Sequence, residues 1–187
     1  TYTPRYRYKI EKGQKEYVSS AYPTFALHYK AGTDVSDKHA MSVFGSAAAS
    51  IHQTLKTSLF SHFIYSATAG VFLNRKSLYL PDYKFFQQNP MVVTDKFFNH
   101  SFNLLPDYTY SNRYWAEAHV MYISDYLLLK NLPFLQNYLF DEALHLHFLN
   151  ADNRFNHIEG GYSIGLGGLS RVGVFTAFDG KKFNSVG

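Results

Sequence analysis

The chain has 187 residues, which is enough for one domain with a sizeable core and short for two. Hydrophobic residues make up 46% and charged residues only 17%, with 17 Phe and 16 Tyr against a single Trp. This balance is unusual for a water-soluble globule and typical of membrane barrels, whose rims carry aromatic girdles. The absence of cysteine excludes a disulfide scaffold, a thiolate metal site and a cysteine nucleophile. The net charge of +4 is scattered without a basic run, so no nucleic-acid partner is expected.

Apolar and polar side chains alternate with a period of two residues, which is the pattern of amphipathic strands. The pattern begins at residues 2–10, passes a turn at residues 11–14 and returns at residues 24–30. It then extends over residues 40–56 and, after a short turn, over residues 58–74. Both stretches exceed an ordinary globular strand, whereas a tilted membrane strand needs about 9 to 11 residues for the bilayer and can continue beyond it. The lengths therefore favour a membrane barrel.

The middle of the chain is less regular. A long aromatic loop is predicted over residues 78–95, where Pro81 and Pro90 bracket the interruption of the strand pattern. Loops of this length are usually functional or ordered against another part of the molecule. Two further strands are predicted at residues 97–105 and 114–124.

The last third of the chain returns to strands. Residues 126–140 place leucines near helical spacing but contain Pro133, which predicts one short interfacial turn. Three consecutive hairpin strands are predicted at residues 142–150, 155–166 and 171–178. Asp179 and Gly180 form a strong hairpin turn, but residues 181–187 are too few to complete a partner strand.

These elements predict an all-β fold, namely an antiparallel transmembrane β-barrel of which the chain supplies about eight strands. Open sheet edges are not tolerated in lipid, so the complete barrel is expected to be larger. Residues 1–187 are interpreted as a single barrel segment, truncated at both ends, because the chain opens without a Met or a leader and stops inside a hairpin.

His145 and His147 lie two residues apart on a predicted strand and therefore share one face. Such a pair can chelate Zn or Cu if a third ligand, such as His157 or Glu159, lies across the hairpin. A closed site needs about four ligands, so polar residues that face the barrel interior are the preferred interpretation. Neither a metal nor a cofactor is predicted.

Glu117 and His119 form a similar pair, and a nearby serine would complete a hydrolase constellation. The candidate serines are Ser101, Ser111 and Ser124. The sequence has no Gly-x-Ser-x-Gly elbow, and strand register cannot be obtained from the sequence. The chain is therefore not predicted to be an enzyme.

The aromatic loop carries a cluster that is a candidate recognition surface. It consists of Tyr79, Asp82, Tyr83, Phe85 and Phe86. These side chains could contact a partner or an extracellular ligand, or the loop could fold into the mouth of the barrel. Burial of aromatic area would order the loop in either case, so both interpretations stay open.

Several stretches resemble a known family. The run from Gly70 to Phe86 reads Gly-Val-Phe-Leu-Asn-Arg-Lys-Ser-Leu-Tyr-Leu-Pro-Asp-Tyr-Lys-Phe-Phe and is similar to that family's Phe-Leu-Asn-Lys and Leu-Tyr-Phe-Pro-Asp-Tyr segments. Other similar stretches follow in the same order, at residues 13–15, 22–25, 107–111 and 117–119. The family is a Bacteroidota-type outer-membrane β-barrel of unknown function, whose C-terminal barrel often follows a carboxypeptidase-regulatory-like domain. The resemblance implies an outer-membrane location and carries no known activity or functional residue.

Three functional hypotheses follow. The preferred one is an outer-membrane barrel in envelope transport, assembly or scaffolding, with outer-membrane lipid and other envelope proteins as its partners. The second is a barrel insertase or translocase, which a lateral seam between the first and last strands would favour. The third is a soluble, lipocalin-like barrel that binds a ligand, in which apolar side chains would point inward and polar ones outward. The direction of the two faces discriminates the third hypothesis from the others.

Overall fold

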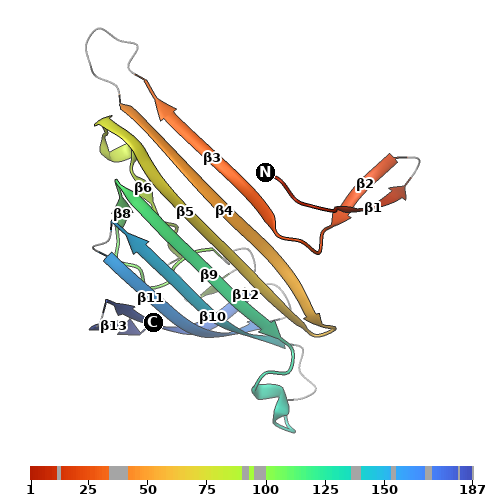
Figure 1. The fold of residues 1–187 in the computed structure, drawn as a ribbon. Coiled ribbons are helices and arrows are strands. Elements are labelled where there is room, and N and C mark those ends of the chain that lie inside the picture. The colour runs from red at the N-terminus through yellow and green to blue at the C-terminus, as the bar shows by residue number, and fades with distance from the viewer. Residues whose placement is uncertain are drawn as a thin grey trace.

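The computed structural model describes residues 1–11, 14–33, 42–89, 93–94, 100–135, 140–152, 155–166, 170–180 and 182–186. One curled antiparallel sheet makes up most of it (Figure 1). Its main strands are β3 (Thr24–Gly32), β4 (Val43–Ser58), β5 (Ser61–Ser77), β9 (Tyr114–Ser124), β10 (Phe140–Ala151), β11 (Phe155–Leu166), β12 (Ser170–Asp179) and β13 (Lys182–Val186). Each pairs with the next in this order. The predicted all-β antiparallel class is confirmed, and the sheet does not close on itself within the described residues.

Shorter elements lie beside this series of hairpins. They are β1 (Arg7–Glu11), β2 (Gln14–Ser19), η1 (Leu80–Asp82), β6 (Lys84–Phe85), β7 (Val93–Thr94), β8 (Tyr110–Ser111) and η2 (Leu129–Asn131). η2 is the short turn predicted within residues 126–140, of which residues 136–139 lie outside the described part. None of the helices in the described ranges has the length and the apolar character needed to cross a bilayer.

The two faces of the sheet differ in polarity, as the period-two pattern predicts. On β10, Leu144, Leu146 and Phe148 are exposed on the convex face, whereas His145 and His147 point to the concave face. The neighbouring strands β9 and β11 show the same difference between their faces, because residues paired directly across two strands lie on the same face. Over β9 to β12, the concave face is therefore largely covered and carries the buried polar side chains, whereas the convex face is mostly apolar and open.

An apolar cluster fills one end of the concave face. It contains Phe44, Phe72, Phe86, Phe102, Leu105, Trp115, Leu149 and Ala151. The Trp115 ring lies directly on Gly70 of β5, so closely that a Cβ atom at residue 70 would come within 2.1 Å of the indole. A side chain at residue 70 would displace the indole, so glycine allows this packing.

The described residues between β5 and β9 (78–89, 93–94 and 100–113), here termed the inner loop, fold back over the concave face (Figure 1). The strand predicted at residues 97–105 is wrong over residues 100–105, where Phe102 makes a single bridge to Gln88. Residues 97–99 lie outside the described part. The reason is tertiary: two successive backbone N–H groups after Phe102 donate to the Glu159 carboxylate of β11, which a regular ladder would not permit.

The N-terminal strand predicted at residues 2–10 is also wrong in extent. Arg5 has a positive φ of 46°, which interrupts the extended backbone before β1. β1 then pairs with β2 in a separate hairpin that the alternation pattern does not reveal. Tyr2 instead forms an isolated bridge to Phe25 of β3.

The hairpin that follows β12 corrects a further expectation. Gly180 adopts a φ of +63° and closes a tight turn. β13 then pairs with β12 from Asp179–Lys182 to Thr176–Val186. Because the turn is so short, the few residues after it are enough for a short partner strand.

Candidate functional site

The concave face carries a group of polar side chains from β9 to β12, all but one of them buried, here termed the histidine–carboxylate cluster. Its members are His119, His147, His157, Glu159 and Asp179. His157 and Glu159 share a face because they are two residues apart on β11, and register places His119 opposite His147 and His157 opposite Asp179. The three histidines and Glu159 are at most 4% exposed, so their charges and dipoles need partners within the protein.

His157 joins the two carboxylates of the cluster. Its Nε2 atom lies 2.7 Å from Glu159 Oε1, and its Nδ1 atom lies 2.5 Å from Asp179 Oδ1. A ring with a carboxylate at each nitrogen can donate from both, which is the bonding pattern of an imidazolium. The three side chains thus compensate one another's charge in a buried setting.

His119 and His147 contact each other through their Nδ1 atoms, which are 2.8 Å apart. One ring must carry its proton on Nδ1 while the other accepts it. The Nε2 atom of each ring is buried and has no hydrogen-bond partner among the described residues. An unsatisfied buried polar atom is uncommon and costs about 1–3 kcal/mol. This pair is therefore the least satisfied part of the cluster.

Residues 100–105 of the inner loop, here termed the covering segment, lie over the cluster. Phe102 is fully buried, and its ring centroid is 4.7 Å from that of His119. The same ring is 6.0 Å from His147 and 5.9 Å from His157. One apolar side chain therefore covers three imidazoles.

Glu159 connects the covering segment to the sheet. The Asn103 N–H donates to Oε2 over 2.9 Å, and the Leu104 N–H donates to Oε1 over 2.8 Å. Together with the bond from His157, the carboxylate has three charge-assisted contacts. One buried carboxylate thus fixes the backbone of the covering segment at Asn103 and Leu104.

A second polar network adjoins the cluster. The Arg171 guanidinium donates from Nη1 to Asp141 over 2.5 Å and from Nε to Ser163 Oγ over 3.2 Å. Ser163 Oγ also lies 2.7 Å from His145 Nε2. The network binds β10, β11 and β12 together on their concave face.

A polar cavity of about 290 Å³ lies between β4, β5, β9 and the inner loop. Its wall includes His52, Lys84, His100, Glu117 and His119. Lys84 Nζ lies 3.4 Å from Glu117 Oε1, so these charges compensate each other. Burial, and then the neighbouring His52, lower the pKa of His100 below its usual value. The cavity can therefore hold water or a small polar solute.

The two histidines considered as metal ligands lie on one face of β10, as their two-residue spacing predicts. His145 and His147 share the concave face with ring centroids 5.9 Å apart, but they have separate hydrogen-bond partners. His157 and Glu159, the other ligands weighed, bind each other. Throughout the part of the chain that the structure describes, no group of three such side chains is arranged to hold a metal ion.

The residues weighed as a hydrolase constellation lie apart or have other partners. Glu117 forms an ion pair with Lys84, and His119 contacts His147. Ser111 donates a hydrogen bond to Asp152. Ser124 accepts a hydrogen bond from the Tyr126 N–H at the far end of β9. Ser101 is buried within the covering segment.

The five residues of the candidate recognition surface divide between two environments. Phe86 is buried in the apolar cluster, and Tyr83 packs on a tyrosine of β8 with 5.0 Å between ring centroids. Asp82 lies 3.6 Å from a lysine ammonium of β3. Tyr79 and Phe85 stay exposed. Recognition by this loop remains a prediction, now restricted to its exposed members.

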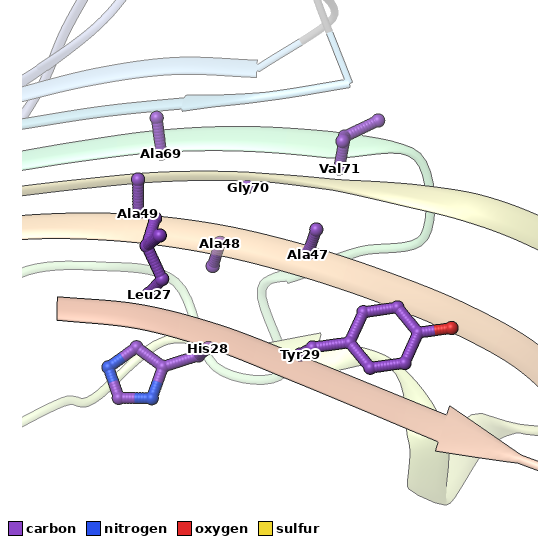
Figure 2. Close-up of a pocket in the computed structure, with 9 residues that line it drawn as sticks. All are labelled: Leu27, His28, Tyr29, Ala47, Ala48, Ala49, Ala69, Gly70 and Val71. Carbon is purple, nitrogen blue, oxygen red and sulfur yellow. The ribbon is translucent and has the colours of Figure 1, made fainter. Parts of the chain in front are cut away.

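The convex face carries a shallow apolar hollow of about 550 Å³ over β3, β4 and β5 (Figure 2). Its lining includes Leu27, Tyr29, Ala47, Ala49, Ala69 and Val71. In Figure 2, Ala49 and Ala69 point to one side of the sheet while Ala48 points to the other. The lining also includes His28 but no Asp, Glu, Lys or Arg, and the hollow belongs to the mostly apolar outer surface.

Residues 1–164 match the C-terminal domain of DUF5686, a family of unknown function. The chain belongs to this family. The matched part of the DUF5686 domain contains the covering segment and every member of the cluster except Asp179. No curated protein and no solved structure matches the chain.

Sequence reasoning places part of the cluster in this DUF5686 domain. The two-residue spacing correctly puts His145 with His147, and His157 with Glu159, on one face. It does not place Asp179, because that contact follows from the register of β11 with β12. It also misses the covering segment, whose only sequence signal is the length of the loop.

Proposed function

We propose that the DUF5686 domain forms the wall of a bacterial outer-membrane β-barrel with a covered interior. The observation that carries this proposal is the direction of the two faces. Buried His147, Glu159 and Arg171 lie on the concave side, while Leu146 and Val174 are more than half exposed on the convex side. A water-soluble barrel would have the opposite arrangement, because burial of apolar area drives its folding.

The strand dimensions support a passage through lipid. β4 and β5 have 16 and 17 residues, beyond the about 9 to 11 that a tilted membrane strand requires. On the convex face of β9, Tyr114 and Tyr122 flank Ala116, Ala118 and Val120. At about 3.4 Å per residue, the two tyrosines are on the order of 27 Å apart along the strand. Aromatic residues at such a separation suit the two interfaces of a band about 25 Å tall.

The covered concave face favours one class of barrel over another. A permanently open pore needs a wide, water-filled interior, whereas here the inner loop packs on β9, β10 and β11. We therefore favour gated transport or envelope assembly over passive diffusion. The soluble lipocalin-like alternative is disfavoured by the polar concave face.

The test is fractionation of the full-length protein, combined with its detergent dependence and its gel mobility before and after boiling. We expect it to enter the outer membrane, to need detergent for a monodisperse state and to shift its mobility on boiling. A protein that stays monodisperse without detergent and shows no shift would contradict the proposal. Ligand binding inside a soluble barrel would then be the hypothesis to pursue.

A further inference from the structure

The contacts of Glu159 point to a movable part of the interior. We propose that the covering segment is a stopper, that Glu159 is the latch that holds it against the barrel wall, and that its withdrawal opens the interior. This inference rests on the proposed function and specifies how the interior would be regulated. It concerns residues 100–105, all of which the structure describes.

The latch consists of one side chain and two backbone N–H groups. Each oxygen of the Glu159 carboxylate accepts one backbone N–H of the covering segment, from Asn103 and Leu104. The carboxylate itself is fixed from the wall side by His157. Two contacts to one buried carboxylate hold the covering segment in one position, and both are weakened when the carboxylate loses its charge.

The polar side chains beneath the stopper do not complement its apolar Phe102 side chain. Phe102 is apolar, yet it packs on the rings of His119 and His147, whose buried Nε2 atoms have no partner among the described residues. Water would satisfy both atoms if the segment withdrew. The closed position is thus favoured by the latch and disfavoured by the unsatisfied imidazoles, as expected of an element with two accessible positions.

The attachments at the two ends of the segment suit a hinged withdrawal. Phe102 is bonded through its backbone to Gln87 and Asn89, so these two stretches of the inner loop form one unit. Phe86 and Leu105, which flank this unit, are buried in the apolar cluster. Between those anchors, the contacts that the described residues make with the sheet include the Glu159 latch, the Phe102 packing, a bond between His100 Nδ1 and Ser66 Oγ, and the pairing of β7 with β12 outside the covering segment.

The experiment places a reporter beside the latch residue, on the wall of the interior. Ala177 is fully buried on the concave face of β12, directly opposite Glu159, and the chain has no cysteine. Ala177→Cys is introduced into the full-length protein after removal of any other cysteine, and its labelling by a small water-soluble maleimide is timed. We expect slow labelling with Glu159 intact.

Glu159→Gln keeps the size of the side chain, but its single amide oxygen can accept only one of the two N–H groups. Labelling of the cysteine should therefore accelerate.

The expected acceleration is at least about tenfold, which corresponds to about 1.4 kcal/mol in the opening equilibrium. The matched control is Glu142→Gln. Glu142 is equally buried and accepts three backbone N–H groups from a loop, where Glu159 accepts two, but that loop contains η2 and does not cover the cluster. Labelling in the control should stay within about twofold of the parent.

A second variant protects the test against simple misfolding. Asn103→Pro removes one donor from the loop side and leaves the wall unchanged, so it should accelerate labelling in the same direction. Planar-bilayer recordings of the same preparations should show more frequent openings for both latch variants than for Glu142→Gln. Equal labelling rates in the latch variants and the control, or rapid labelling of the parent, would overturn the latch.

The outcomes separate the two proposals. Membrane fractionation and the boiling shift test the barrel, and cysteine labelling tests the latch whether or not the protein is in a membrane. A membrane barrel whose labelling ignores Glu159 keeps the proposed function and refutes the stopper. A protein that labels as expected but fractionates as soluble refutes the barrel and retains the movable segment.

Discussion

The Asp152 side chain organises the rim of the sheet where β10 turns into β11. Its carboxylate accepts hydrogen bonds from the Ser111 hydroxyl and from the N–H groups of Asn112, Arg113 and Tyr114. Burial alone would raise the pKa of Asp152, but the Ser111 hydroxyl and then the N–H groups hold it below the usual value of 3.8. The ionised form is therefore part of the folded rim.

This arrangement predicts an acid-sensitive contribution to stability. A depressed folded pKa means that the carboxylate stabilises the fold above about pH 3.8, and that this stabilisation is lost as the pH falls through the lowered folded value. Asp152→Asn should lower the free energy of unfolding by about 1 kcal/mol at pH 7, and the gap to the parent should close in acid. Thermal unfolding across this pH range measures it, with the exposed Asp107→Asn as a control that should show no gap. A pH-independent gap would contradict the assignment.

Gly70 gives a second test at the residue scale. A Cβ atom at residue 70 would lie 2.1 Å from the Trp115 ring, whereas one at Gly160 would have its nearest neighbour at 3.9 Å. Gly70→Ala should therefore destabilise by about 1–3 kcal/mol through overpacking, and Gly160→Ala by less than about 0.5 kcal/mol. Denaturant unfolding of both variants gives the comparison. Similar losses in the two would mean that Trp115 does not pack on β5 as described.

At the scale of elements, the strands with clear alternation are the ones that the sequence predicts well. On β10 and β11, apolar and polar residues alternate over most of each strand, so their existence and the faces of His145 and His157 follow from the sequence. The covering segment could not be predicted in the same way. Its conformation is set by Glu159, a partner distant in sequence, and local patterns carry no information about such a contact.

The turn that contains η2 shows the same kind of dependence on a distant carboxylate. Glu142 of β10 accepts the N–H groups of three consecutive residues, Leu127, Leu128 and Leu129, over 2.9–3.0 Å. Glu142→Gln leaves at least one of these donors without its charged acceptor. We expect faster limited proteolysis within residues 126–135, located by mass spectrometry, and no change there in Glu159→Gln. Unchanged cleavage in Glu142→Gln would show that other contacts hold the turn.

At the scale of the whole molecule, the apolar convex face and the covered polar concave face must be explained together. In water, exposure of the leucines and valines would be unfavourable because their apolar area stays hydrated. Burial of the imidazoles and carboxylates would add an unfavourable desolvation free energy. In lipid, the first cost disappears because the solvent is apolar. The second is reduced by the pairing within the cluster and by Glu159 with the inner loop. The lipid solvent of the proposed function thus accounts for the convex face, and pairing within the protein accounts for the concave face.

The solvent of the convex face can be tested by itself with two leucines. Leu146 lies in the middle of β10 and is 53% exposed, and Leu59 lies in the β4–β5 turn and is 91% exposed. In lipid, Leu146→Arg should destabilise the barrel by about 2–4 kcal/mol and reduce its yield in the outer membrane, whereas Leu59→Arg should be nearly neutral because it lies beyond the band. In water, both substitutions fall on exposed sites and both should change stability by less than about 0.5 kcal/mol. The comparison of the two variants in folding yield and heat-modifiable mobility therefore decides which solvent the convex face meets, and equal behaviour of the two would speak against the membrane.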